Sequence, residues 1–237
     1  RISRAVAAGL ALGMAGVALL IGEDAAAMLE RLGDLEREYE EVEARLAQPP
    51  RGPAVARADL PQADKVALFC QWAEANNATV ARVAADQVPG EVVGYLARNN
   101  LPAQAAMAPG DELACYDWAG QKMLSLRKGR AEGSDAVSIT GAFAGIAETG
   151  TLVMASGPDH PVTLNLLPDT HVVVLCESDI VGGYEDVWAR LRARYGKDRM
   201  PRTVNTITGP SRTGDIEQTI ELGAHGPRRM HILVVRE

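Results

Sequence analysis

The sequence predicts an α/β fold, in which a mainly parallel sheet is flanked by helices and preceded by a helical appendage. Apolar strand-like runs alternate with amphipathic helical stretches along residues 62–237, as is typical of βαβ architecture. The run HVVVLC at residues 171–176 reads as a strand buried within such a sheet. The chain has 237 residues, 47% of them hydrophobic, which is enough for one substantial core. We expect an N-terminal helical segment at 1–48, a linker at 49–61 and an α/β domain at 62–237.

The N-terminal segment contains two apolar patterns. Ten of the eighteen residues at 5–22 are Ala or Gly, so this uncharged stretch is expected to be a helix rather than a membrane span, with a membrane or export role as the alternative. An a/d stripe follows on a long helix, which either folds back on its own domain or docks on a partner helix. Its members are Met28, Leu32, Leu35, Tyr39, Val42 and Leu46.

The elements expected after the Pro- and Gly-rich linker follow from hydrophobic periodicity and turn residues. Residues 117–130 give a mixed signal and receive no assignment. The expected helices are 62–75, 91–98, 180–195 and 215–222, and the expected strands are 79–83, 137–140, 151–155, 171–176, 202–208 and 231–235.

Charge and cysteine content exclude several classes of function. A net charge of −7 argues against nucleic acid or an anionic membrane as the main partner, although a local site for a small anionic metabolite is compatible with it. Cys70, Cys115 and Cys176 form no CxxC pair, so neither a zinc ribbon nor a self-ligated iron–sulfur cluster is expected. We expect three buried thiols in a reducing, cytoplasmic compartment, and no metal site. Composition leaves open whether the chain forms a homo-oligomer.

The first candidate ligand loop is GIAETGTLV at residues 145–153. In open α/β sheets, ligands gather where strands end at their carboxyl edge. Gly150 permits close backbone approach, Thr149 and Thr151 offer hydroxyls, and Glu148 is a carboxylate beside an apolar strand. The alternative is a tight turn with a solvated glutamate.

The second candidate is TGPSRTGDIEQ at residues 208–218, which we expect to lead from a strand into a helix. Free amides at a helix start, two hydroxyls and a guanidinium suit a carboxylate or phosphate. Asp215 complicates this prediction, because it already complements the positive helix end; it either fixes Arg212 or favours an uncharged ligand. A simple helix cap is the alternative. The candidates are Gly209, Ser211, Arg212, Thr213 and Asp215.

His225 lies in the loop AHGP at residues 224–227. An imidazole there is either an acid, base or hydrogen-bond donor, or purely structural. No GxGxxG, GxxxxGK[ST], GxSxG or HExxH signature is present. A conventional dehydrogenase, ATPase, serine hydrolase or zinc protease is therefore disfavoured.

The C-terminal half of the sequence resembles the LUD domain of the lactate-utilisation protein C family. The resemblance rests on DAVSITGAFAGIAETGTLV at 135–153, LLPDTHVVV at 166–174 and ITGPSRTGDIEQTIELGAHGPRRMHILVV at 207–235. It implies a fold like that of the NagB/RpiA/CoA-transferase group. It also implies a place in a system that oxidises L-lactate to pyruvate with two iron–sulfur partner proteins, this chain holding no cofactor itself. The loop residues named above, with Glu148 and His225 as catalytic candidates, become the site candidates.

Two hypotheses for the function follow. The first is an accessory, non-redox subunit of a lactate-oxidising assembly. The second is a stand-alone enzyme of acyl- or CoA-transfer or cyclo-ligase type, with Glu148 as nucleophile or base and Ser211, Arg212 and Thr213 holding the anionic group. Whether the chain is an enzyme at all stays open, because no acid–base pair stands at a recognisable spacing.

Overall fold

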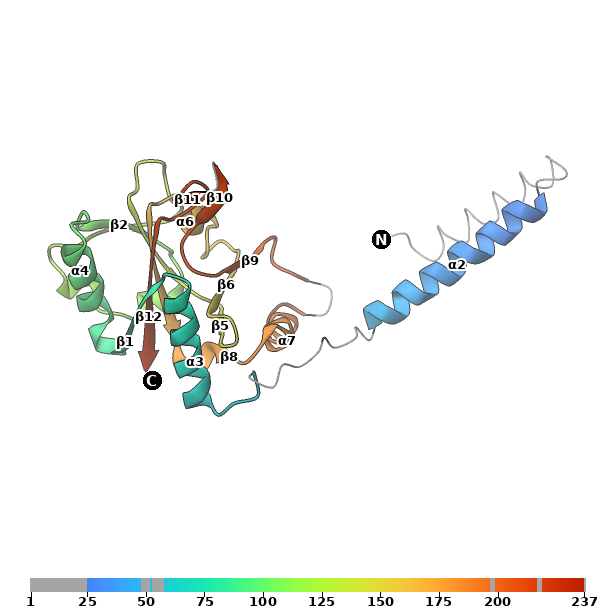
Figure 1. Cartoon of the computed structure of the whole chain (residues 1–237), viewed down its shortest axis with the longest axis horizontal. Coiled ribbons are helices and arrows are strands. Elements are labelled where there is room, and N and C mark those ends of the chain that lie inside the picture. Colours follow the sequence, from blue (N-terminus) through green and yellow to red (C-terminus); the bar gives the residue numbers. More distant parts are fainter. Residues whose placement is uncertain (1–24, 48–51, 53–57, 197–198, 217–218, 237) are drawn as a thin grey trace. The chain divides into compact units, whose positions relative to one another are not determined.

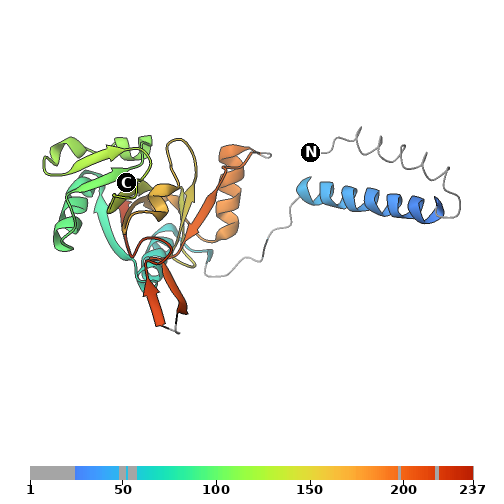
Figure 2. The same ribbon diagram turned by 90° about the horizontal axis from the view of Figure 1, so that it is seen from above.

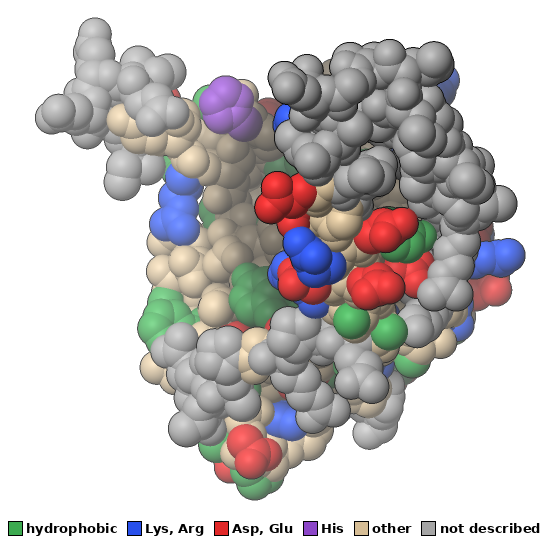
Figure 3. Space-filling view, turned by 90° about the vertical axis from the view of Figure 1, so that its right-hand side faces the viewer, with side chains coloured by type: hydrophobic (Ala, Val, Ile, Leu, Met, Phe, Trp, Pro, Cys, Tyr) green, Lys and Arg blue, Asp and Glu red, His purple; other side chains and the backbone are tan. Residues whose placement is uncertain are grey.

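A computed structural model describes residues 25–47, 52, 58–196, 199–216 and 219–236 of the chain (Figure 1). It divides into two units, Arg1–Gly52 and Pro53–Glu237. Side chains of both charges are interspersed on the described surface seen in Figure 3, and no continuous basic patch occurs on that described surface.

Helix α2, Ala25–Ala47, is the described element of the first unit. Four members of the expected stripe, Leu35, Tyr39, Val42 and Leu46, are exposed, at 36–70% of their surface. The side chains of Met28 and Leu32 lie outside the described residues, as does the uncharged stretch at 5–22. Among the helices that are described, none is long and apolar enough to cross a membrane.

The second unit is built on a six-stranded sheet in which every neighbouring pair is parallel, with the order β1-β12-β7-β4-β2-β3. The buried apolar runs of the sequence form its centre, as a parallel sheet covered on both faces requires. The strands are β1 (Thr79–Ala84), β2 (Gln104–Met107), β3 (Ser125–Lys128), β4 (Val137–Gly141), β7 (Thr170–Cys176) and β12 (Arg229–Arg236).

Successive residues of β7 point into two different cores. Val172 and Val174 pack with helix α4 (Val88–Arg98) and with Leu113 of α5 (Asp111–Ala114). Val173 and Leu175 pack with helix α3 (Gln62–Ala75) and with a second sheet. Helices therefore lie on both faces of the six-stranded sheet, with α4 on one side and α3 on the other (Figure 1).

The second sheet has four strands in the order β8-β5-β6-β9, of mixed direction. One face packs on the main sheet through Leu152 and Met154, and the other packs on helix α7 (Tyr184–Tyr195) through Val153. Its strands are β5 (Ala144–Ile146), β6 (Thr151–Ala155), β8 (Ile180–Val181) and β9 (Val204–Ile207). The short helices are α6 (Thr163–Leu166), η2 (Ala85–Gln87), η3 (Trp118–Gly120) and η4 (Glu177–Asp179).

The prediction of a helix at residues 215–222 is wrong. This segment belongs to an antiparallel hairpin of β10 (Arg212–Ile216) and β11 (Thr219–Leu222), which stands out from the rest of the domain in Figure 2. Arg212 pairs with Leu222, and Ile216 pairs with Thr219. The backbone amides there donate across a ladder, so the helix N-terminus invoked for an anion site does not exist.

The other expected elements occur close to their expected places. Helix α3 spans residues 62–75 as expected, and the four strands expected at 79–83, 137–140, 151–155 and 171–176 correspond to β1, β4, β6 and β7. The helix expected from 180 begins at Tyr184, because residues 180 and 181 form β8. Strands β2, β3 and β5 were not expected.

Candidate functional site

The candidate loops meet at the C-terminal end of α3, around Asn76. The Asn76 amide donates from Nδ2 to the Trp72 carbonyl at 2.8 Å and to the Thr149 carbonyl at 3.4 Å. Its Oδ1 accepts from the Arg212 guanidinium at 3.5 Å. One side chain thus joins both loops, and sequence analysis did not select it as a site residue.

Two glycines allow the loops to reach the end of α3. Gly150 and Gly209 both have left-handed backbone conformations, with φ of 67° and 71°. A Cβ on Gly150 would clash with the Ala73 backbone, and one on Gly209 would clash with the Asn76 carbonyl oxygen. Both the backbone conformation and the lack of a side chain are therefore required at these two positions.

Behind this contact, four hydroxyl groups form a part-buried cluster centred on Thr151. The Thr151 hydroxyl lies 2.7 Å from that of Thr149 and 2.7 Å from that of Thr208. Tyr184 donates to it from α7 at 3.4 Å. The Thr151 side chain is fully buried, so its hydrogen bonds replace the water that it loses on folding.

Glu148 is buried rather than solvated, with 8% of its surface exposed. Its backbone N–H donates to the Gly182 carbonyl at 3.2 Å, which ties the loop to the start of α7. A Cβ on Gly183 would lie only 3.3 Å from Glu148 Oε1, so the glycine leaves room for the carboxylate. Within the described part of the chain, no residue donates a hydrogen bond to that carboxylate.

Ser211 and His225 are brought together at the base of the hairpin. Ser211 N–H donates to the Pro227 carbonyl at 2.8 Å, and its Oγ accepts from the His225 backbone N–H at 3.3 Å. Both residues therefore belong to one polar turn, with the His225 side chain exposed. Thr213 follows on β10, and the Asp215 side chain lies outside the described residues.

The position of this loop cluster differs from the expectation that it would lie at the carboxyl edge of the main sheet. Asn76 precedes β1 and Pro227 precedes β12, so the cluster lies near the amino ends of these parallel strands. The four strands of the second sheet all come from residues 144–207. The loop that contains Thr149, between β5 and β6, and Gly209, just after β9, both contact Asn76 at the end of α3.

None of the three cysteines is fully buried, contrary to the prediction of three buried thiols. Cys70 and Cys176 are half-buried, and burial raises the pKa of the Cys70 thiol. Cys115 is exposed, since it follows the short helix α5, where its thiol donates to the Glu112 carbonyl at 3.2 Å. In the described part of the chain, no three His, Cys, Asp or Glu side chains are grouped to hold a metal ion.

Two histidines lie inside the core, away from the loops. His171 is fully buried, and desolvation lowers its pKa from 6.5 to about 3. His231 stacks on Tyr95 with ring centroids 4.0 Å apart, and burial lowers its pKa to about 4 despite the nearby Glu91 carboxylate, which acts in the opposite direction. Both imidazoles are neutral near pH 7 and contribute to the core rather than to a site.

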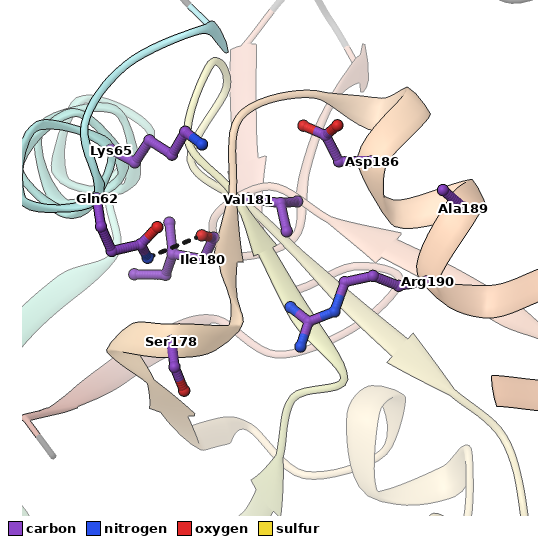
Figure 4. A pocket seen from close by; sticks show the side chains of 8 residues that line it. All are labelled: Gln62, Lys65, Ser178, Ile180, Val181, Asp186, Ala189 and Arg190. Carbon is purple, nitrogen blue, oxygen red and sulfur yellow. Dashed lines mark hydrogen bonds between the residues drawn. The ribbon is translucent and has the colours of Figure 1, made fainter. Parts of the chain in front are cut away.

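A pocket of about 410 Å³ lies between the start of α3 and helix α7 (Figure 4). Ile180 and Val181 of β8 form part of its wall, and Gln62, Lys65, Asp186 and Arg190 bring polar groups to it. Sequence analysis did not anticipate it, because its lining comes from segments far apart in the chain, residues 62–65 and residues 178–190.

The structure thus defines an α/β protein with a parallel main sheet, a second mixed sheet and a polar loop cluster at one helix end. Residues 66–235 match the LUD domain family. The chain therefore belongs to the LUD domain family.

Individual relatives agree with this assignment. A protein described as uncharacterized from Neisseria meningitidis is 40% identical over 96 residues, 40% of each chain. Lactate utilization protein C is 34% identical over 102 residues in Geobacillus sp. (43% of this chain, 42% of that one) and 34% identical over 109 residues in Halalkalibacterium halodurans (46% and 47%). The matches span about half the length of these relatives or less.

A solved structure has the same fold. The crystal structure of a DUF162 family protein from Deinococcus radiodurans superposes with a TM-score of 0.55 at 24% identity, covering 74% of this chain and 99% of that one. The expectation of an α/β fold with a mainly parallel sheet is thereby confirmed, as is the resemblance to the lactate-utilisation protein C family.

Proposed function

We propose that this chain is an accessory, non-redox subunit of a cytoplasmic system that oxidises L-lactate to pyruvate. The observation that carries the proposal is that the ETGT and GPSRT loops, which lie within the family match, meet around Asn76. Relatives named for lactate utilisation support the same class of process.

The loop cluster offers the groups that a small hydroxy or oxo acid requires. The exposed Arg212 guanidinium carries a positive charge that attracts a carboxylate. Its planar N–H groups can donate hydrogen bonds to both carboxylate oxygens at once. The polar turn of Ser211 and His225 adds hydrogen-bonding groups at the base of the same hairpin. The Thr151 hydroxyl, which bonds those of Thr149 and Thr208, holds the loops in place.

Binding at this cluster is tested by thermal unfolding of the full chain with L-lactate, pyruvate, CoA or phosphate. At a ligand concentration of 100 times the dissociation constant, the free energy of unfolding rises by about 2.7 kcal/mol, or roughly 5–10 °C for a domain of this size. The shift is expected to vanish in Arg212→Ala and to persist in Arg202→Ala, a matched change at an exposed arginine outside the cluster. An equal shift in both variants would rule out Arg212 as a ligand contact.

In this proposal, the iron–sulfur clusters that carry out the redox chemistry belong to partner proteins. Helix α2 is the proposed docking element, since four apolar side chains of its stripe are exposed. Deletion of residues 1–48 is expected to abolish co-purification with the partners while the LUD domain stays folded. Undiminished co-purification of the folded deletion variant would remove α2 from the proposal.

A second candidate function rests on Glu148. A carboxylate with 8% exposure and no described hydrogen-bond donor is suited to nucleophilic or base chemistry of the acyl- or CoA-transfer or cyclo-ligase kind. Glu148→Gln keeps the shape of the side chain and removes its charge. Unchanged turnover of the Glu148→Gln protein on any substrate found would dismiss this role, whereas a loss of 10²-fold or more would favour it over the accessory role.

A further inference from the structure

Two cysteines that are far apart in the sequence lie at the carboxyl edge of the main sheet. Cys176 is the last residue of β7, and Cys115 directly follows helix α5. Helix α5 lies against this edge, because a Cβ on Gly141, the last residue of β4, would clash with the Glu112 side chain. Gly141 in turn pairs with Val174 of β7. Both cysteines therefore lie near the same strand ends.

The face of the sheet distinguishes these two cysteines from the third. Val174 of β7 and Leu113 of α5 pack in the same core. Side chains two residues apart point to one face of a strand, so Cys176 shares the face of Val174. Cys70 packs against the opposite core, which contains α3. The sheet therefore separates Cys70 from Cys176.

The Tyr116 hydroxyl lies between the two thiols. It is within hydrogen-bonding distance of both Cys115 and Cys176, and burial together with these two neighbours raises the pKa of the hydroxyl. The Tyr116 ring packs against the first core and meets the Trp118 ring edge-on, with centroids 6.2 Å apart. Two sulfur atoms that contact one oxygen atom are close neighbours in space.

The two thiols differ in exposure and in how firmly they are held. Cys115 is exposed and Cys176 is half-buried. Cys115 caps a helix of four residues, Asp111–Ala114, and its thiol donates to the Glu112 carbonyl at 3.2 Å. A thiol is a weak donor, so rotation of this side chain toward Cys176 costs little. Bond formation needs the two Cβ atoms about 3.5–4.5 Å apart.

We propose that Cys115 and Cys176 form a reversible disulfide when the protein encounters hydrogen peroxide. The exposed Cys115 sulfur attacks one peroxide oxygen, the O–O bond breaks, and a water leaves as Cys115 becomes a sulfenic acid. The Cys176 sulfur then attacks the Cys115 sulfur, the S–O bond breaks, and a second water leaves. The two thiols thus lose two electrons and two protons, and the peroxide is reduced to two waters. This modification site is independent of the proposed function.

The test is oxidation of the full chain with stoichiometric hydrogen peroxide, followed by peptide mapping without reductant and by thermal unfolding. Mapping is expected to find the Cys115 peptide joined to the Cys176 peptide, and dithiothreitol is expected to separate them again. The unfolding midpoint is expected to rise by roughly 5–15 °C, because a bridge that closes a loop of about 60 residues restricts the unfolded chain.

Serine variants assign the two steps. Cys70→Ser is the matched control, and it is expected to form the bridge as the natural sequence does. Cys176→Ser is expected to stop at the Cys115 sulfenic acid, which dimedone labels. Cys115→Ser is expected to give neither a bridge nor a rise in the midpoint. Circular dichroism checks that each variant is folded.

Three results would overturn the proposal. The first is that the oxidised natural sequence contains no joined peptides. The second is that Cys70 takes the place of either cysteine in the joined pair. The third is a bridge between two chains through Cys115, seen as a dimer on a non-reducing gel. Each of these results comes from the natural sequence, so the proposal stays testable even where a variant does not fold.

Discussion

Gly209 lies directly against the backbone carbonyl of Asn76, so closely that a Cβ would overlap the oxygen. With φ at 71°, the position is doubly restricted to glycine. We predict that Gly209→Ala lowers the free energy of unfolding by at least about 1 kcal/mol, from backbone strain and from displacement of the loop. Urea unfolding measures this, with Gly133→Ala as the control because nothing lies within 4 Å of a Cβ there. Equal effects of the two changes would contradict the close contact.

Thr151→Val is expected to destabilise the domain although it conserves shape. The change removes the buried hydroxyl that bonds Thr149, Thr208 and Tyr184, so all three hydrogen bonds are lost. The expected loss is about 1–3 kcal/mol in the free energy of unfolding, measured in urea. Thr206→Val, at an exposed position of β9, serves as the control and is expected to change stability by less than about 0.5 kcal/mol. A neutral Thr151→Val protein would show that the cluster is not a stabilising unit.

Stability is expected to fall with acidity because His171 and His231 are buried in the neutral form. Their folded pKa values, about 3 and about 4, lie below the unfolded value of about 6.5, so between these limits the unfolded chain binds protons that the folded chain does not. The free energy of unfolding therefore decreases as the pH falls from about 6.5 toward 4, by at most about 1.4 kcal/mol per pH unit for each histidine.

Urea titrations at several pH values between 4.5 and 7.5 measure this slope. His231→Gln is expected to reduce it. An unchanged slope in His231→Gln would mean that this imidazole is charged in the folded state.

The exposed stripe of α2 is expected to contribute nothing to the stability of the isolated chain. Leu35 and Val42 are 54% and 51% exposed, so Leu35→Ser with Val42→Ser removes little buried apolar surface. We predict a thermal unfolding midpoint of the LUD domain within about 1 °C of that of the natural sequence. A clear drop in the midpoint would show that α2 packs on its own domain in solution.

Most of the main sheet was predictable from the sequence because its central strands are continuous apolar runs. The continuous apolar run of β7 and the closing run of β12 indicate burial on both faces, and the structure buries both. Strand β2 was missed because the four residues Gln104–Met107 are mostly Ala and Met, which carry no β-branched signal. Strand β3 is short and largely exposed, so no apolar period marks it.

The hairpin at Arg212–Leu222 was mistaken for a helix for a specific reason. Ile216 and Ile220 are four residues apart, a spacing that places two residues on one face of a helix and equally on one face of a strand. Acidic residues around them added a helix signal. The antiparallel pairing of Thr213 with Glu221 shows that the segment is a hairpin. A pattern of two isoleucines cannot distinguish a helix from a strand.

The candidate loops were identifiable from their residue types, and their common neighbour was not. Asn76 was visible only as a helix end, whereas the structure uses its side chain to contact both Thr149 and Arg212. In the sequence, Tyr184 is likewise only one member of the amphipathic pattern of helix α7, yet its hydroxyl donates a hydrogen bond to the Thr151 hydroxyl. Both contacts join residues more than thirty positions apart, which local patterns do not encode.

Strand β1 has one neighbour in the main sheet, and that neighbour is β12, with Thr79 paired to His231. During synthesis, β1 therefore has no native edge to join until residues 229–236 have emerged from the ribosome. Non-local parallel pairing of this kind forms slowly, because the chain must lose the entropy of closing a long loop before the first hydrogen bonds between the strands form. Until then the edge of β7 that pairs with β12 is unpaired on a nascent chain, so we expect this domain to depend on chaperones in the cell more than a local α-helical fold of equal size.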